Sequence, residues 1–196
     1  MFKCHRLPTE PVTMLPRHLG IKMSHYYEIY ELYELQDRLE QYRRKNSLEI
    51  HGVPESAYSM TEEVVLKSAE VLEVLITPQD VEISHKLKRK GNKPMIVKFA
   101  HHKIKSNIYK SRTKLKNIKV SNLFPGANAA TPAAGDRIFW HENLTSYGKK
   151  IVSRVNKTRR DEVLQSVWTL DGKVYVKTSP EGRAIKINDL EDLESL

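Results

Sequence analysis

The order of apolar and polar positions predicts short strands alternating with helices in the middle of the chain. Four runs have the β-branched and aromatic content of strands and are bounded by turn residues: 48–53, 81–89, 94–100 and 137–143. Two runs carry apolar side chains three and four residues apart, as amphipathic helices do: about 60–75 and 101–118. The predicted order is β-α-β-β-α-β, with both helices on one face of an antiparallel sheet.

A helix is also predicted before this region. In residues 25–46, Leu32, Leu35, Leu39 and Tyr42 follow the three-four-three spacing of a coiled-coil seam. Two heptads leave two interpretations open: a short coiled coil that joins copies of the chain, or a helix packed on its own domain. Residues 1–24, with prolines among scattered charges, are expected to form a disordered tail.

A second small domain is predicted over residues 144–196. Thr145 is a plausible N-cap for a basic helix that runs to about Arg160. Residues 166–178 have the pattern of a hairpin, with a type I′ turn at Asp171-Gly172. A third strand is expected over 184–188, and the acidic end is either a short helix or a frayed tail. The predicted class is α+β: an N-terminal helix, an RNA-recognition-motif (RRM)-like sandwich over 47–143, and a helix-hairpin domain.

Composition and charge narrow the classes of function. Apolar residues make up 39% of the 196 and charged residues 29%, a globular balance, and no run approaches the roughly 20 apolar residues of a membrane helix. The single cysteine, Cys4, excludes an internal disulfide and favours a reducing compartment. Without an apolar leader segment, we expect an intracellular protein, in a cytoplasmic ribonucleoprotein, in the nucleus, or in both.

The net charge of +9 is concentrated in one half of the chain. Residues 47–82 hold eight acidic residues and one lysine, whereas residues 83–135 hold thirteen Lys or Arg and no acidic residue. Residues 136–160 add seven basic residues against two acidic ones. Solubility alone does not require so long a like-charged block, although a solvated lysine-rich face is the simpler alternative. A phosphate backbone is the better explanation.

Several segments resemble one known family. They are RRKNSLEIHGVPE, DVEISHKLKRKGNKPMIVKFAHHKIKSNIYKSRTKLK, IFWHENLTSYGKKIVSRVNKTRR and VWTLDGKVYVKTSPEGRAIKINDLEDLESL. In this order they resemble the first-open-reading-frame proteins of LINE-type non-LTR retrotransposons, over about residues 30–196. The last two also resemble the C-terminal region of the baculovirus few-polyhedra (FP) protein. The resemblance implies a coiled coil, an RNA-recognition fold, a small C-terminal domain, and RNA packaging and chaperoning.

The sheet lacks the usual stacking residues of RNA-recognition motifs. On the third strand the two base-stacking aromatics of that motif would fall at Pro94 and Ile96, and on the first strand Glu49 and His51 point outward. Phe99 is expected in the core. We therefore expect no base-specific readout through the sheet. Six other aromatics are candidates for stacking, but each is more often a core residue at such spacing: Tyr109, Phe139, Trp140, Tyr147, Trp168 and Tyr175.

Binding is instead expected to depend on charge. Lys and Arg side chains would follow phosphates along a basic groove without choosing bases, and the affinity would depend strongly on salt. The candidate residues are Lys86, Lys88, Arg89, Lys90, Lys93, Lys98, Lys103, Lys105, Lys110, Arg112, Lys114, Lys149, Lys150, Arg154, Lys157, Arg159, Arg160 and Arg183.

Two functions remain open at this point. The first is a non-enzymatic protein that binds, packages and chaperones single-stranded RNA or DNA, with self-association through the N-terminal helix. The second is a coiled-coil structural protein of the FP type that acts through a protein partner. No phosphate-binding loop, nucleophile elbow, dinucleotide motif or metal-ligand spacing occurs, so neither an enzyme nor a cofactor or metal is expected.

Overall fold

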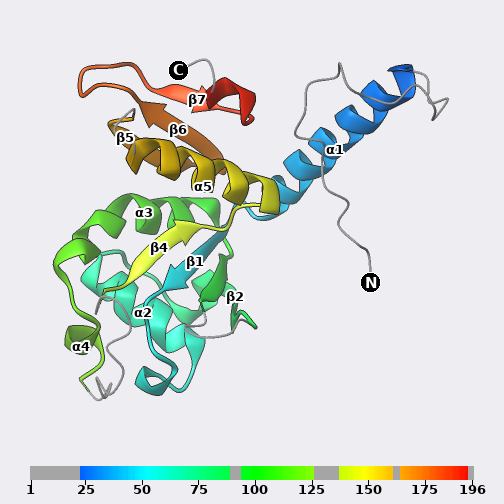
Figure 1. Cartoon of the computed structure of the whole chain (residues 1–196). Coiled ribbons are helices and arrows are strands. Elements are labelled where there is room, and N and C mark those ends of the chain that lie inside the picture. Colours follow the sequence, from blue (N-terminus) through cyan, green and yellow to red (C-terminus); the bar gives the residue numbers. More distant parts are fainter. Residues whose placement is uncertain (1–22, 89–93, 126–136, 161–163, 194–196) are drawn as a thin grey trace. The chain divides into compact units, whose positions relative to one another are not determined.

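A computed structural model describes residues 23–88, 94–125, 137–160 and 164–193 (Figure 1). The chain divides into two compact units, Met1–Gln36 and Asp37–Leu196. The expected tail lies outside the described residues, except for its last two, which already belong to the first helix.

That helix, α1, spans Met23–Arg43 and so begins two residues earlier and ends three residues earlier than predicted. The four side chains of the expected seam are exposed: Leu32 by 64%, Leu35 by 50%, Leu39 by 57% and Tyr42 by 64%. Both interpretations of the seam, a short coiled coil and a helix packed on its own domain, stay predictions. At the C-terminal end of α1, within the second unit, Gln41 accepts a hydrogen bond from the Thr145 N–H and Arg44 donates to the Leu144 carbonyl.

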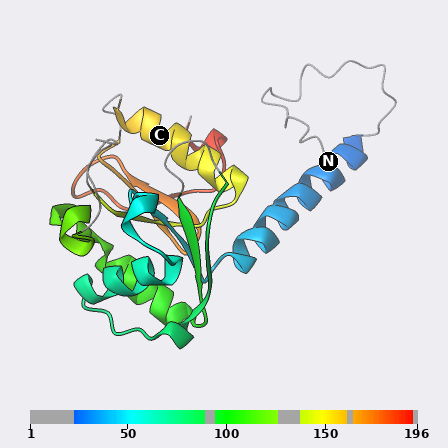
Figure 2. The same cartoon turned by 90° about the horizontal axis from the view of Figure 1, so that it is seen from below.

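The second unit contains a four-stranded antiparallel sheet with the strand order β2-β3-β1-β4. Figures 1 and 2 show helices α2 and α3 on the same side of this sheet. The strands are β1 (Ser47–His51), β2 (Val81–Lys86), β3 (Met95–Phe99) and β4 (Phe139–Glu142). The helices are α2 (Thr61–Val71), α3 (His102–Ser111) and the single-turn α4 (Val120–Leu123), with 3₁₀ turns η3 (Glu55–Ala57), η4 (Pro78–Asp80) and η5 (Arg112–Asn117).

One face of the sheet is buried against α2 and α3. Leu48 and Ile50 of β1 and Met95, Val97 and Phe99 of β3 are almost completely buried. They pack with Val64, Val65 and Leu72 of α2 and Ile108 of α3. The strict alternation of burial along β3 confirms the strand predicted here and the assignment of Phe99 to the core. The predicted α+β class is confirmed.

Both helices of this domain are shorter than predicted. Helix α2 ends at Val71 rather than near Leu75, because Glu73 adopts a left-handed φ of 58°, and Leu75 is fully exposed. The α-helix predicted to reach residue 118 ends at Ser111 and continues as the 3₁₀ turn η5. The buried Leu115 keeps η5 attached to the core.

The C-terminal region has its own core. Helix α5 (Ser146–Arg160) packs on the three-stranded sheet β5-β6-β7, made of Ser166–Leu170, Lys173–Lys177 and Ile185–Ile187 (Figure 1). Thr145 caps α5 as predicted, because its Oγ1 accepts a hydrogen bond from the Gly148 N–H at 3.0 Å. The predicted turn is also confirmed: both Asp171 and Gly172 have positive φ, 50° and 75°.

At the acidic end, expected as either a short helix or a frayed tail, the described residues form the single 3₁₀ turn η6, Glu191–Leu193. Across the described ranges, no helix combines the length and apolar character that a bilayer crossing requires.

Candidate nucleic-acid interface

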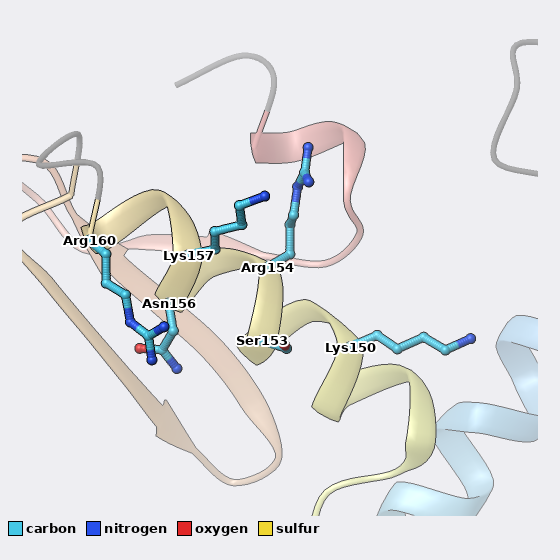
Figure 3. A pocket seen from close by; sticks show the side chains of 6 residues that line it. All are labelled: Lys150, Ser153, Arg154, Asn156, Lys157 and Arg160. Atoms are coloured by element: carbon cyan, nitrogen blue, oxygen red, sulfur yellow. The ribbon is translucent and has the colours of Figure 1, made fainter.

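A group of exposed cations lies on α5. Gly148, Ile151 and Val155 are buried and fix one face of the helix toward the C-terminal core. Because side chains three and four positions apart share a helix face, Lys150, Arg154 and Lys157 all lie on the solvent side. Figure 3 shows Arg154 and Lys157 extending away from the helix.

These cations line an open hollow of about 570 Å³, here called the basic hollow. Its described lining residues all come from α5: Lys150, Ser153, Arg154, Asn156, Lys157 and Arg160 (Figure 3). None of the six is acidic. None of the ion pairs formed among the described residues involves Lys150, Arg154 or Lys157. The basic hollow is therefore a concentration of positive charge in which, among the described residues, no carboxylate pairs with Lys150, Arg154 or Lys157.

Several other candidate lysines are paired with carboxylates. The Lys98 ammonium donates to Glu82 at 2.5 Å, and that of Lys149 donates to the buried Glu49 at 2.5 Å. Lys114 forms an ion pair with Glu73, and Lys86 approaches Glu55 at 3.9 Å. All four carboxylates belong to the acidic segment 47–82, which therefore lies against lysines from the basic part of the sequence. The charge that these four lysines offer a phosphate is correspondingly reduced.

Lys105 is the clearest correction to the predicted interface. Its side chain is only 2% exposed, and its ammonium donates to Glu142 Oε1 at 2.5 Å and lies 3.4 Å from an Asp171 carboxylate oxygen. Glu142 Oε2 in turn accepts a hydrogen bond from the Gly172 N–H at 3.0 Å. A phosphate cannot reach this ammonium without unfolding its surroundings. The assignment of Lys105 to nucleic-acid binding is therefore wrong.

The remaining candidates fall into three groups. Arg112 packs its guanidinium 3.7 Å from the centre of the Tyr109 ring and donates to the Tyr109 carbonyl, so it is held in place beside α3. Exposed candidates on other parts of the surface are Lys88, Lys103, Lys110, Arg159 and Arg183. Outside the described residues lie Arg89, Lys90 and Lys93.

The face of the four-stranded sheet opposite α2 and α3 carries a row of three rings, of which sequence analysis did not foresee His141. Phe139, expected in the core, is 46% exposed, and its ring stacks on His141 with centroids 6.2 Å apart. His141 meets His51 of the neighbouring strand edge-on at 5.2 Å. Desolvation and then the neighbouring His51 lower the pKa of His141. The alternation of side chains along β4 explains this placement. Because Trp140 is buried, its neighbours Phe139 and His141 face outward.

Glu49 anchors α5 to this same face. It is buried, accepts a hydrogen bond from Lys149, and lies 3.3 Å from the His51 ring nitrogen. Burial alone would raise the pKa of Glu49, but the hydrogen bonds and charges of His51 and Lys149 outweigh it and lower the pKa. Glu49 is therefore a carboxylate that holds the start of α5, and the basic hollow with it, on the sheet.

The other aromatic candidates are divided between core and surface. Trp140 and Tyr109 are buried as expected, and Tyr147 is half-buried. Trp168 and Tyr175 are half-buried and stack on each other across β5 and β6, with ring centroids 5.8 Å apart. Lys173, Lys177 and Lys186, which the predicted interface did not include, belong to the same small sheet.

Comparison with known proteins adds no identity to this geometry. Neither the protein-family models nor the sequences of curated proteins match the chain.

Proposed function

We propose that this chain binds single-stranded nucleic acid, RNA in particular, without catalysis and without base-specific readout. The observation that carries the proposal is the basic hollow, which Lys150, Arg154 and Lys157 of α5 line. Cations grouped on one side of a rigid helix bind a polyanion through its phosphates, and such contacts carry no sequence information.

The architecture of residues 47–143 supports the same proposal. Two helices cover one face of a sheet with the order β2-β3-β1-β4, and the elements follow one another as β-α-β-β-α-β. We infer that this region is an RRM-like domain, a type that commonly binds single-stranded RNA. Packaging and chaperoning of RNA, as implied by the resemblance to LINE-type first-open-reading-frame proteins, are the cellular roles that fit such binding.

The proposal is tested by measuring binding of a labelled single strand of about 30 nucleotides, as RNA and as DNA, across a salt series. For the wild-type protein we expect log K to fall steeply with log salt, with similar slopes for unrelated sequences. Replacing Lys150, Arg154 and Lys157 together by Ala should reduce the magnitude of the slope by about 2, since each phosphate contact on a single strand contributes about 0.7.

A matched control removes the same charge elsewhere. Lys67, Lys98 and Lys114 each pair with a glutamate, so replacing these three by Ala also lowers the net charge by three. We expect this control to change the slope much less. An equal loss in both triple variants would mean that only net charge matters and that the basic hollow is not the site. No binding at low salt would reject the proposal.

One observation favours the alternative, a coiled-coil protein of the FP type. The seam residues Leu32, Leu35 and Leu39 of α1 are at least half exposed, and exposed apolar side chains in a row are typical of a protein–protein interaction surface. Negligible binding of nucleic acid together with stable association through α1 would select this alternative.

A further inference from the structure

The C-terminal sheet has two chemically different faces. Val174, Val176 and Ile187 are buried beneath α5 with Ile151 and Val155. Because successive residues of a strand point to opposite faces, Tyr175 and its direct cross-strand partners Trp168 and Lys186 lie on the face turned away from α5. The strand positions of this outer face are Ser166, Trp168, Leu170, Lys173, Tyr175, Lys177 and Lys186.

Two features of the outer face point to a ligand with flat rings and negative charge. The Trp168 and Tyr175 rings are nearly parallel, with an interplanar angle of 15°. Lys173 and Lys177 flank Tyr175 along β6, Lys186 lies beside it on β7, and no strand position of this face is acidic. A core-forming sheet face would instead carry aliphatic side chains, as the opposite face does.

Trp168 lies on an edge strand of the small sheet. Strand order β5-β6-β7 places β5 at the edge of the sheet, so no further strand of this sheet lies beyond Trp168. Tyr175 supports the indole from the inner side at a centroid distance of 5.8 Å. Stacking on an aromatic side chain accepts any base, because every base has a π-face.

We propose that the outer face of the β5-β6-β7 sheet is a base-stacking subsite for single-stranded nucleic acid. A base of the strand stacks on Trp168, which Tyr175 supports, and Lys173, Lys177 and Lys186 contact the flanking phosphates. This inference rests on the proposed function and adds to it a contact with the bases, which the basic hollow does not supply.

The test compares an oligothymidine with an abasic oligonucleotide of the same length, because the two share phosphates and differ in bases. We expect the wild-type protein to bind oligothymidine about tenfold more tightly, the effect of one or two stacked bases. The double variant Trp168→Leu/Tyr175→Leu should bind both strands with the affinity that the wild-type protein has for the abasic one. Trp168→Phe, which keeps a ring, should retain part of the preference.

Tryptophan fluorescence supplies a second readout that needs no destabilising substitution. The chain has two tryptophans, and Trp140 is only 2% exposed, so Trp168 is the one that a bound base can quench. We expect quenching by oligothymidine, none by the abasic strand, and loss of the effect in Trp168→Phe. Equal binding of both strands without quenching would overturn the stacking subsite and leave the proposed function standing. Absence of binding to either strand would overturn both.

Discussion

Lys105 and Glu142 form an ion pair in the interior of the second unit, with Nζ and Oε1 2.5 Å apart and both side chains 2% exposed. Lys105 comes from α3, which covers the four-stranded sheet, and Glu142 ends β4. The other carboxylate oxygen of Glu142 accepts from the Gly172 N–H at the tip of the C-terminal hairpin. The pair therefore connects the two cores of this unit.

Removing one partner of this pair should destabilise the protein strongly. Lys105→Met leaves the Glu142 carboxylate buried without its counter-charge, and we expect the free energy of unfolding to fall by about 3–5 kcal/mol. The double variant Lys105→Met/Glu142→Gln should recover part of this loss, because the amide is neutral and still accepts from Gly172. Urea unfolding of Lys105→Met, Glu142→Gln and the double variant measures the interaction energy between the two side chains. If the losses of the single variants add up to that of the double variant, the two side chains do not stabilise each other.

The stability of the α5 anchor should depend on pH. Because the pKa of Glu49 is lowered in the folded state, its ionised form stabilises the protein above the unfolded carboxyl pKa of about 4.3. This contribution is lost as pH falls from that value through the folded pKa. Since the Lys149 ammonium is partly exposed, Lys149→Gln should cost only about 1 kcal/mol at pH 7, and the difference from wild type should shrink below pH about 4.

A neighbouring lysine provides the control for this measurement. Lys150 follows Lys149 on α5 and points to solvent, so Lys150→Gln should change unfolding little at either pH. A pH-independent difference between wild type and Lys149→Gln would show that the Glu49 pair does not stabilise the fold.

A side chain at residue 172, at the hairpin tip, should destabilise the fold. Gly172 has φ of 75°, and a Cβ atom there would lie 2.5 Å from Gln41 Cγ. We expect Gly172→Ala to cost about 1–2 kcal/mol through the left-handed backbone, with a further loss from displacement of Gln41. Thermal unfolding in wild-type and Gln41→Ala backgrounds separates the two causes. An equal loss in both backgrounds would leave only the backbone contribution.

Helix α1 should drive self-association. Two charges in the seam, Leu35→Lys/Leu39→Lys, should keep the chain monomeric at concentrations where the wild-type protein associates, because lysines repel across a coiled-coil interface. Asp37→Lys lies off the seam and changes the net charge by the same two units, so it should associate as the wild type does. Sedimentation equilibrium measures the masses, and a wild-type protein that stays monomeric at every concentration would contradict the prediction.

Local patterns were sufficient to predict most of the secondary structure. The alternation in 94–100 predicted the buried face of β3, and Asp171-Gly172 predicted the turn and therefore the register of β5 and β6. That register already pairs Trp168 with Tyr175, so the aromatic pair was available from the sequence once the turn type was known. Helix ends were less predictable, because the left-handed Glu73 and the 3₁₀ turn η5 leave no strong signal in the residues around them.

By itself, the sequence determined the order of the elements, the turn at residue 172 and the long basic block, because each depends on neighbours along the chain. Only the tertiary structure decided which cations of that block face solvent. Lys103 and Lys105 are two residues apart on α3, yet Lys103 is exposed, whereas Lys105 is buried against Glu142, 37 residues away. Burial and ion pairing join residues distant along the chain, so a charge pattern does not show which cations remain available for a phosphate.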